Sequence, residues 1–279
     1  MRKSFNVASK SLRDQKWQIV GYGLALLAMA ALVVFIWPSY RTTVESINLP
    51  EAVQAFLGSD LSYASAPGFV SAEFFSWIPV LLIVYAVVQG TGAIAGEEGS
   101  GTIDLLMAQP VARSTMVLQK CLAFCVGAVL VVALGFAGFA VSIPLVSIDI
   151  TLPDAVVACA NLLPITLLFF TFSLWLGAVA ANRGMAAGVA VAVAAGAYFA
   201  NSLASGVHAV SWLRYASPFY YYGAGLPLVK GIDWPQVALL LGVSALFLAL
   251  SLRAFERRDI AIGGVASLTP RDLLRRAMG

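Results

Sequence analysis

Long apolar runs, separated by short polar stretches, dominate the chain. A helix that crosses a bilayer needs about 20 predominantly apolar residues. Six runs meet this requirement, at residues 18–37, 74–95, 121–146, 155–181, 184–207 and 235–252. The pattern predicts an all-α integral membrane protein with six transmembrane helices. It also predicts that the whole chain, 1–279, forms one transmembrane domain.

Composition and charge agree with this prediction and orient the spans. Mean hydropathy is +0.88, and only 11% of residues are charged, against roughly 25% in soluble domains. With the N-terminus inside, every Lys and Arg except Arg41, Arg214 and Lys230 falls on the cytoplasmic side, as the positive-inside rule requires. We therefore expect a multi-pass protein of the cytoplasmic membrane with both termini cytoplasmic. The net charge of +3 reflects this bias and indicates no nucleic-acid partner.

Both cytoplasmic ends of the chain carry basic residues. The lead, residues 1–16, resembles the start of a signal peptide, but the apolar run behind it is too long, and we interpret that run as a retained span. Phe5, Val7, Leu12 and Trp17 give the lead a partial apolar face, so it is either an amphipathic helix on the inner surface or a solvated flank. The tail, residues 253–279, can contact anionic membrane lipids.

The stretch 208–234 is too apolar for an ordinary loop and too interrupted by Pro and Gly for a span. It is rich in Trp and Tyr, which gather at membrane interfaces. We predict a broken, re-entrant external segment of one or two short helices. A plain aromatic loop at the interface is the alternative.

The interiors of the six runs contain no Asp, Glu, Lys, Arg or His. Proton relays place such groups inside the bilayer, so their absence disfavours a stand-alone proton-driven carrier and weakens the case for a sodium-driven one. Intramembrane hydrolysis is disfavoured too, and we predict no catalytic residue on this chain. We expect most of the remaining polar side chains to form hydrogen bonds between helices, and a minority to line a path. These are Gln89, Thr91, Asn161, Thr166, Thr171 and Asn201.

Neither a metal site nor a nucleotide site is predicted. Cys121, Cys125 and Cys159 lie in apolar runs, where free cysteine behaves as a small hydrophobe. The chain has no GxxxxGK[ST] phosphate loop. If it moves a solute against a gradient, the energy must enter from outside the spans.

A densely patterned polar segment, residues 96–120, separates the second run from the third. Thr102 can cap a short helix that carries Leu105 and Leu106, and Pro110 prevents its continuation. Such a helix could insert its leucines into a groove of a soluble partner. Alternatively, it is a capped loop helix that packs under its own bundle.

The run EEGSGTIDLLMAQPVAR at 97–113, closed by Lys120, resembles the hallmark of type-2 ABC transporter permeases, the group that includes drug, sodium and lipid exporters. The sequence FERRDI at 255–260 is similar to the usual ending of the family after span six. Six spans with a broken segment before the last one agree with this resemblance. Gln119 departs from the glycine that is common before the lysine.

The resemblance implies a permease subunit that pairs with a second permease subunit, as a homodimer, and with two copies of a cytosolic ATPase. ATP and Mg²⁺ would be held by the ATPase, with no cofactor on this chain. The segment 96–120 would contain the coupling helix, and the lead would make a second contact. The implied coupling residues are Glu97, Glu98, Gly101, Thr102, Leu105, Leu106, Pro110 and Arg113.

The broken segment would then act as an external gate, with Pro218, Tyr220, Tyr221 and Gly223 as candidate residues. The implied function is ATP-driven export of a substrate across the cytoplasmic membrane. The alternative hypothesis is a membrane scaffold whose ATPase drives maturation or remodelling of an extracytoplasmic partner without solute export.

Overall fold

The computed structural model describes residues 5–46, 65–96, 113–206 and 208–257. These residues contain helices and no strand. Six helical stretches are long and apolar enough to cross a membrane, which confirms the predicted fold class. They are Ala8–Thr43, Ala66–Ala95, Ser114–Leu145, Leu152–Val179, Arg183–Gly206 and Trp234–Glu256. The orientation of the two termini stays a prediction.

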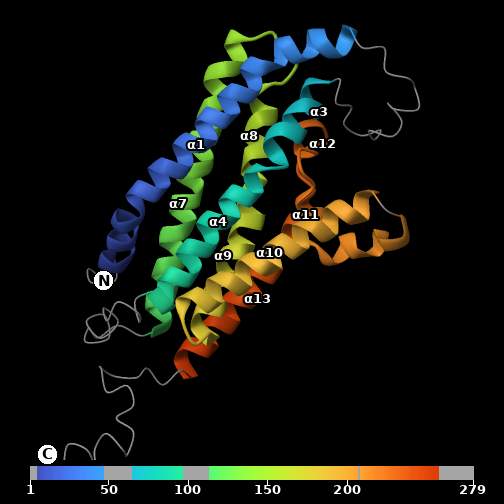
Figure 1. Cartoon of the computed structure of the whole chain (residues 1–279). Coiled ribbons are helices and arrows are strands. Elements are labelled where there is room, and N and C mark those ends of the chain that lie inside the picture. The colour runs from blue at the N-terminus through green and yellow to red at the C-terminus, as the bar shows by residue number, and fades with distance from the viewer. Residues whose placement is uncertain (1–4, 47–64, 97–112, 207, 258–279) are drawn as a thin grey trace, which may run out of the picture.

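The first span is longer than predicted at both ends. Helix α1 (Phe5–Ser46) continues from the predicted lead into the span without a break. It also runs past residue 37, where the predicted span ends, and through Pro38. Proline inside a helix removes one backbone hydrogen bond, and α1 changes direction near its C-terminal end (Figure 1).

The second span is irregular at both ends and starts before the predicted residue 74. It consists of α3 (Ala66–Val70), the π-helical turn η1 (Ser71–Phe75), α4 (Ile78–Thr91) and a second π-helical turn, η2 (Gly92–Gly96). The Ser65 side chain caps α3 by accepting a hydrogen bond from the Gly68 amide at 3.2 Å. π-Helical turns such as η1 and η2 are frequent at functional sites.

The third span, α7 (Arg113–Ser142), ends in the 3₁₀ turn η3 (Ile143–Leu145). The fourth is broken at Asn161 into α8 (Leu152–Ala160) and α9 (Leu162–Val179), whereas we predicted one continuous helix. Helix α10 (Arg183–Gly206) is followed by a broken segment, as predicted, but with three short helices where we expected one or two. That segment comprises the 3₁₀ helix η4 (His208–Ala216), α11 (Pro218–Tyr222) and α12 (Pro227–Lys230). Helix α13 (Trp234–Arg257) completes the described chain.

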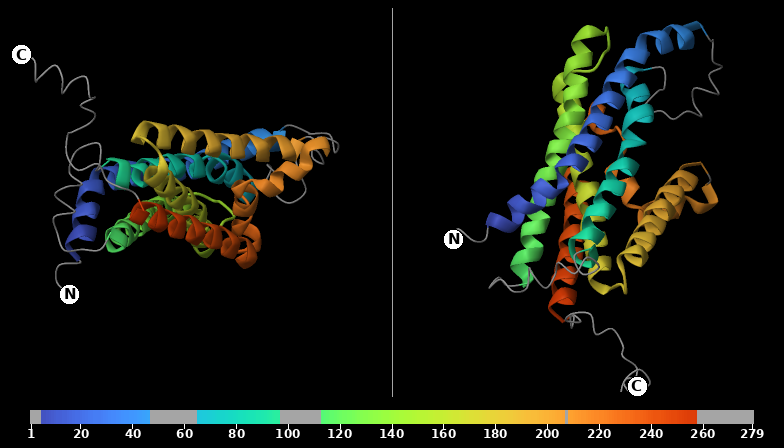
Figure 2. Two further views of the ribbon diagram at one scale, coloured as in Figure 1. Left: turned by 90° about the horizontal axis from the view of Figure 1, so that it is seen from below. Right: turned by 60° about the vertical axis from the view of Figure 1, so that its left-hand side comes forward.

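Helix α9 lies at the centre of the bundle and contacts α4, α10 and α13 (Figure 1). Aromatic rings fill much of this core: the rings of Phe124 on α7 and Phe170 on α9 stack with centroids 3.8 Å apart. Helix α10 lies on the outside of the bundle in both views of Figure 2. It exposes large apolar side chains such as Val191 and Phe199, which in a membrane protein face lipid or another chain.

Helices α1 and α7 pack along much of their length (Figure 2). Small residues allow this close approach: a Cβ atom at Gly138 would overlap the carbonyl oxygen of Leu27. Backbone-to-backbone proximity of this kind is typical of membrane helix pairs.

We expect Gly138→Ala to destabilise the protein because the added methyl group meets backbone that cannot move away, at a cost of about 1–3 kcal/mol. Gly188→Ala on α10 is the matched control, since its Cβ would meet no atom within 4 Å. Thermal unfolding in detergent should show a lower midpoint for Gly138→Ala alone. Equal midpoints for both variants would contradict the packing described.

Candidate functional site

The ends that flank the predicted coupling segment lie together at one end of the bundle, called the lower end here. The start of α1, the end of α4, the starts of α7 and α10 and the end of α13 all lie there (Figure 1). Arg113 is the first residue of α7, and its side chain lies outside the described part of the structure. The other predicted coupling residues lie outside the described part of the chain, so their role stays a prediction. They are Glu97, Glu98, Gly101, Thr102, Leu105, Leu106 and Pro110.

Two cations from other helices bind backbone carbonyl groups at the lower end of the second span. Lys120 Nζ on α7 donates to the carbonyl oxygen of Ala93 at 2.6 Å, and Arg183 Nη2 on α10 donates to that of Val88 at 3.2 Å. The C-terminal end of a helix carries partial negative charge, which favours cations nearby. The Val88 oxygen already accepts from the Gly92 amide within its own helix, so Arg183 is a second donor to it. Both cations therefore stabilise this helix end, and they tie α7 and α10 to it.

Glycine allows the guanidinium group to approach so closely. A Cβ atom at Gly92 would lie 3.2 Å from Arg183 Nη2, which is tighter than most Cβ contacts. The sequence had marked Lys120 as the end of the family motif and Arg183 only as a basic residue. Nothing in the sequence pattern indicated that both side chains meet the same helix end.

The first span is tied to the second by amides. Tyr85 on α4 donates its hydroxyl to Gln15 Oε1 at 3.3 Å, and Gln15 Nε2 donates to Ser11 Oγ at 3.1 Å. One turn further along each helix, Gln89 Nε2 donates to Gln18 Oε1. These hydrogen bonds join the start of α1, which overlaps the predicted lead, to the second span. Lys120 and Arg183 bind the same span from α7 and α10.

A polar cavity of about 210 Å³ lies among these groups. It is bounded by α1, α4, α7 and α10, with Phe170 of α9 on one wall. The charged side chains among its described lining residues are Lys10, Asp14, Lys120 and Arg183.

The broken segment is built from caps and tight turns. Ser217 begins α11 by accepting a hydrogen bond from the Phe219 amide at 3.3 Å, and it donates to the carbonyl oxygen of Ala197 on α10 at 2.8 Å. Gly223 ends α11 with φ +60°, a conformation that favours glycine. Gly225 has φ +74°, and a Cβ there would collide with the side chain of Ser71. The segment therefore lies directly against the second span.

Tyr222, which was not among the predicted gate residues, joins the segment to two spans. Its hydroxyl donates to the carbonyl oxygen of Phe75 at 3.1 Å, and its carbonyl oxygen accepts from Asn161 Nδ2 at 2.8 Å. Asn161 lies at the break between α8 and α9, so the broken fourth span supplies the amide that holds this segment. All three groups are buried.

The predicted gate residues lie on α11 around this contact. Pro218 occupies the first turn of α11 and Gly223 ends it. Tyr221 donates its hydroxyl to the carbonyl oxygen of Tyr215 at 2.8 Å, and the Tyr220 ring packs edge-on against the Tyr215 ring at 5.1 Å. The structure brings these residues together, while their action as a gate stays a prediction.

Arg214 packs on the same aromatic group. Its guanidinium carbon lies 4.9 Å from the ring centre of Tyr215, and Nη2 donates to the Tyr215 hydroxyl at 2.8 Å. This hydrogen bond raises the pKa of Arg214 above its ordinary value. Like any arginine, it carries a positive charge at physiological pH, and it brings that charge onto the aromatic group.

We expected most of the six polar side chains within the spans to form hydrogen bonds between helices; two do so, three bond within their own helices, and for Asn201 the expectation stays a prediction. Gln89 and Asn161 form hydrogen bonds between elements. The hydroxyl groups of Thr91, Thr166 and Thr171 instead donate to carbonyl oxygens of their own helices, at 2.7, 2.7 and 3.0 Å. A short β-branched hydroxyl reaches the carbonyl group three or four residues earlier more easily than it reaches a neighbouring helix.

The family model described as ABC-2 family transporter protein matches residues 6–260. The chain belongs to this family. It is therefore a membrane permease component of an ABC transporter, which confirms the resemblance based on residues 97–113. No curated protein matches the chain significantly in sequence.

We expect Lys120→Met in this ABC-2 family protein to lower the free energy of unfolding by about 1–3 kcal/mol, because the Ala93 carbonyl group loses a charged donor. Lys120→Arg should restore most of the loss. Arg253→Met, on an exposed position of α13, is the control, and thermal unfolding in detergent is the measurement. A Lys120→Met midpoint equal to that of the control would refute the assigned tie.

Tyr222→Phe should also destabilise the protein by about 1–3 kcal/mol, because the buried Phe75 carbonyl group loses its hydroxyl donor. Tyr220→Phe removes a hydroxyl from a half-buried neighbour and should have a small effect. Protease cleavage within 208–234, followed over time, should accelerate only for Tyr222→Phe. Identical cleavage rates would show that the Tyr222 hydroxyl does not hold the segment.

Proposed function

We propose that the chain is the membrane subunit of an ATP-driven exporter, and that residues 97–113 bind a separate cytosolic ATPase. Membership of the ABC-2 family supports a partnership with an ABC ATPase. The observation that carries the proposal is the pair of ties at the lower end of the second span. Through Lys120 and Arg183, a force applied to the segment between α4 and α7 acts on three spans together.

The second span also reaches the broken segment. Its η1 turn supplies the Phe75 carbonyl group that binds Tyr222, and Ser71 lies against Gly225. One span thus contacts both the flanks of the proposed coupling segment and the proposed gate. In the proposed mechanism, closure of the ATPase pair on ATP moves the lower end of this span. The movement shifts α11 and opens an outward path for the substrate.

We further propose that the working assembly has two copies of this chain and two of the ATPase, which holds ATP and Mg²⁺. The exposed apolar faces of α1 and α10 support a second permease copy, since they leave apolar surface that lipid or another membrane helix must cover. No observation on the described residues favours the alternative, a scaffold that exports no solute.

The test uses the chain co-expressed with its ABC ATPase and purified as a complex. Leu105→Asp should reduce recovery of the ATPase about tenfold or more, because a carboxylate would be buried in an apolar groove. Leu105→Met, of similar volume, should retain the complex. Normal ATPase recovery and stimulated hydrolysis with Leu105→Asp would show that the coupling residues are assigned wrongly.

Vesicles that contain the intact complex separate export from scaffolding. For an exporter, ATP hydrolysis should rise with a transported solute and drive its vectorial movement. Hydrolysis that responds only to an extracytoplasmic protein, with no solute moved, would support the scaffold instead.

A further inference from the structure

We propose that the polar cavity at the lower end binds a phosphate group, carried either by an anionic lipid headgroup or by a small soluble phosphate ester. The site is formed by Lys10 of α1, Lys120 of α7 and Arg183 of α10, with amide groups of α1 and α4. Among the described residues, the site shares Lys120 with the segment 96–120 and no residue with the broken segment. It does not depend on the transport function proposed above.

The first argument is charge. Among the described residues, those that line the cavity include three cations and one carboxylate, Asp14. The wall behind them includes the apolar side chains of Val88 and Phe170, and apolar walls strengthen the field of charges that line a cleft. A cavity with this excess of positive charge attracts an anion and repels metal cations.

The second argument is geometry. The three cations come from three different helices and line one cavity. They can therefore donate to different oxygens of a tetrahedral anion. Lys120 and Arg183 are each held by a hydrogen bond to a backbone carbonyl group. Because these bonds already orient the two side chains, less conformational entropy is lost when an anion binds.

Arg183 has the donors that this role needs. A guanidinium group carries five N–H donors in a plane, and the bond to the Val88 oxygen uses one of them. Arginine with donors to spare is the usual partner of phosphate oxygens. Gln89 donates to Gln18 Oε1, so the amide nitrogen of Gln18 is a further donor at the cavity wall.

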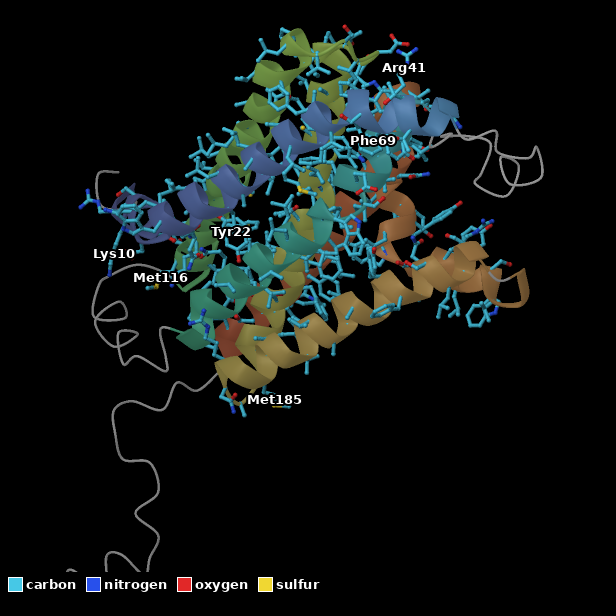
Figure 3. The ribbon with its side chains drawn as sticks, turned by 45° about the horizontal axis from the view of Figure 1, so that its top comes forward. Lys10, Tyr22, Arg41, Phe69, Met116 and Met185 are labelled. Carbon is cyan, nitrogen blue, oxygen red and sulfur yellow. The ribbon has the colours of Figure 1, made fainter. Side chains whose placement is uncertain are left out.

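The third argument is position. Lys10, Asp14 and Gln18 lie on the first turns of the span Ala8–Thr43, and Lys120 and Arg183 lie near the starts of α7 and α10. Figure 3 shows Lys10 and Met116 at the same end of the bundle. Groups at the ends of spans lie at the depth of lipid headgroups. The volume of about 210 Å³ accommodates a phosphate together with part of its substituent.

A bound phosphate would bridge the start of α1 to α7 and α10, next to the end of the second span. It would therefore restrain the region where these helices flank residues 97–112. Anionic lipid, or a phosphate ester, would stabilise one arrangement of the lower end.

The test uses the full chain in micelles of an uncharged maltoside detergent and in a buffer without phosphate, with thermal unfolding as the readout. Three probes are titrated separately: phosphatidylglycerol, glycerol 3-phosphate and inorganic phosphate. The variants are Lys10→Gln and the double variant Lys10→Gln/Arg183→Gln. The matched control is Arg253→Gln, which removes an exposed charge from α13.

At least one probe should raise the unfolding midpoint of the wild type and of Arg253→Gln. The apparent affinity should fall about tenfold in the double variant, the loss expected for a charge-assisted hydrogen bond, and less in Lys10→Gln. A response to phosphatidylglycerol alone identifies a lipid headgroup, whereas a response to the two soluble probes identifies a free phosphate compound.

Three results would overturn the proposal. No probe stabilises the wild type; the double variant responds as the wild type does; or Arg253→Gln loses as much affinity as the double variant, which would show a diffuse charge effect. Lys10→Gln keeps the test decisive if Arg183→Gln prevents folding. Lys10 is an exposed side chain, so a folded Lys10→Gln variant with unchanged affinity also refutes the site.

Discussion

Backbone carbonyl groups at the irregular ends of the second span need hydrogen-bond donors, and the structure around them depends on how this need is met. In a bilayer, an unsatisfied backbone group costs several kcal/mol. At one end Lys120 donates to Ala93 and Arg183 adds a second donor to Val88, and at the other end the donor is the hydroxyl of Tyr222. Each donor comes from a different element. The same hydrogen bonds that satisfy this span therefore decide where α7, α10 and the broken segment lie.

The breaks in other elements follow from this arrangement. Tyr222 can reach Phe75 because Gly225 lets the chain lie directly against Ser71. The carbonyl group of Tyr222 then needs a donor of its own, and Asn161 supplies it. An asparagine at the junction of α8 and α9 is thus explained by its partner 61 residues away rather than by the helix that it interrupts. The irregular elements of the protein support one another.

Hydropathy predicted the six spans because burial of apolar side chains in lipid needs only length and composition. It missed their ends: residues such as Lys10, Asp14 and Lys120 continue the helices once these reach the interface, where charge is tolerated. Hydropathy also could not show the break at Asn161, since one amide hardly changes an apolar window. The sequence drew attention to Tyr220 and Tyr221, but only the fold shows that Tyr222 points inward to Phe75. Long-range hydrogen bonds of this kind leave no local pattern.

In the proposed mechanism the second span transmits movement from the lower end of the bundle to the broken segment. The stiffness of this span matters for that role as much as its contacts do. Helix α4 is a continuous helix between two π-helical turns, and hydrogen-bonded helices transmit displacement with little internal change, whereas π-turns can absorb a change in register. Displacement at Ala93 would reach Phe75 mainly as a rigid movement. The buried core around Tyr85 and Phe124 resists sideways motion, because packed interiors are not continuously deformable. Movement along or about the helix axis is then the easiest response. Such movement would act directly on the hydrogen bonds at its two ends, which involve Lys120 and Arg183 at one end and Tyr222, held by Asn161, at the other.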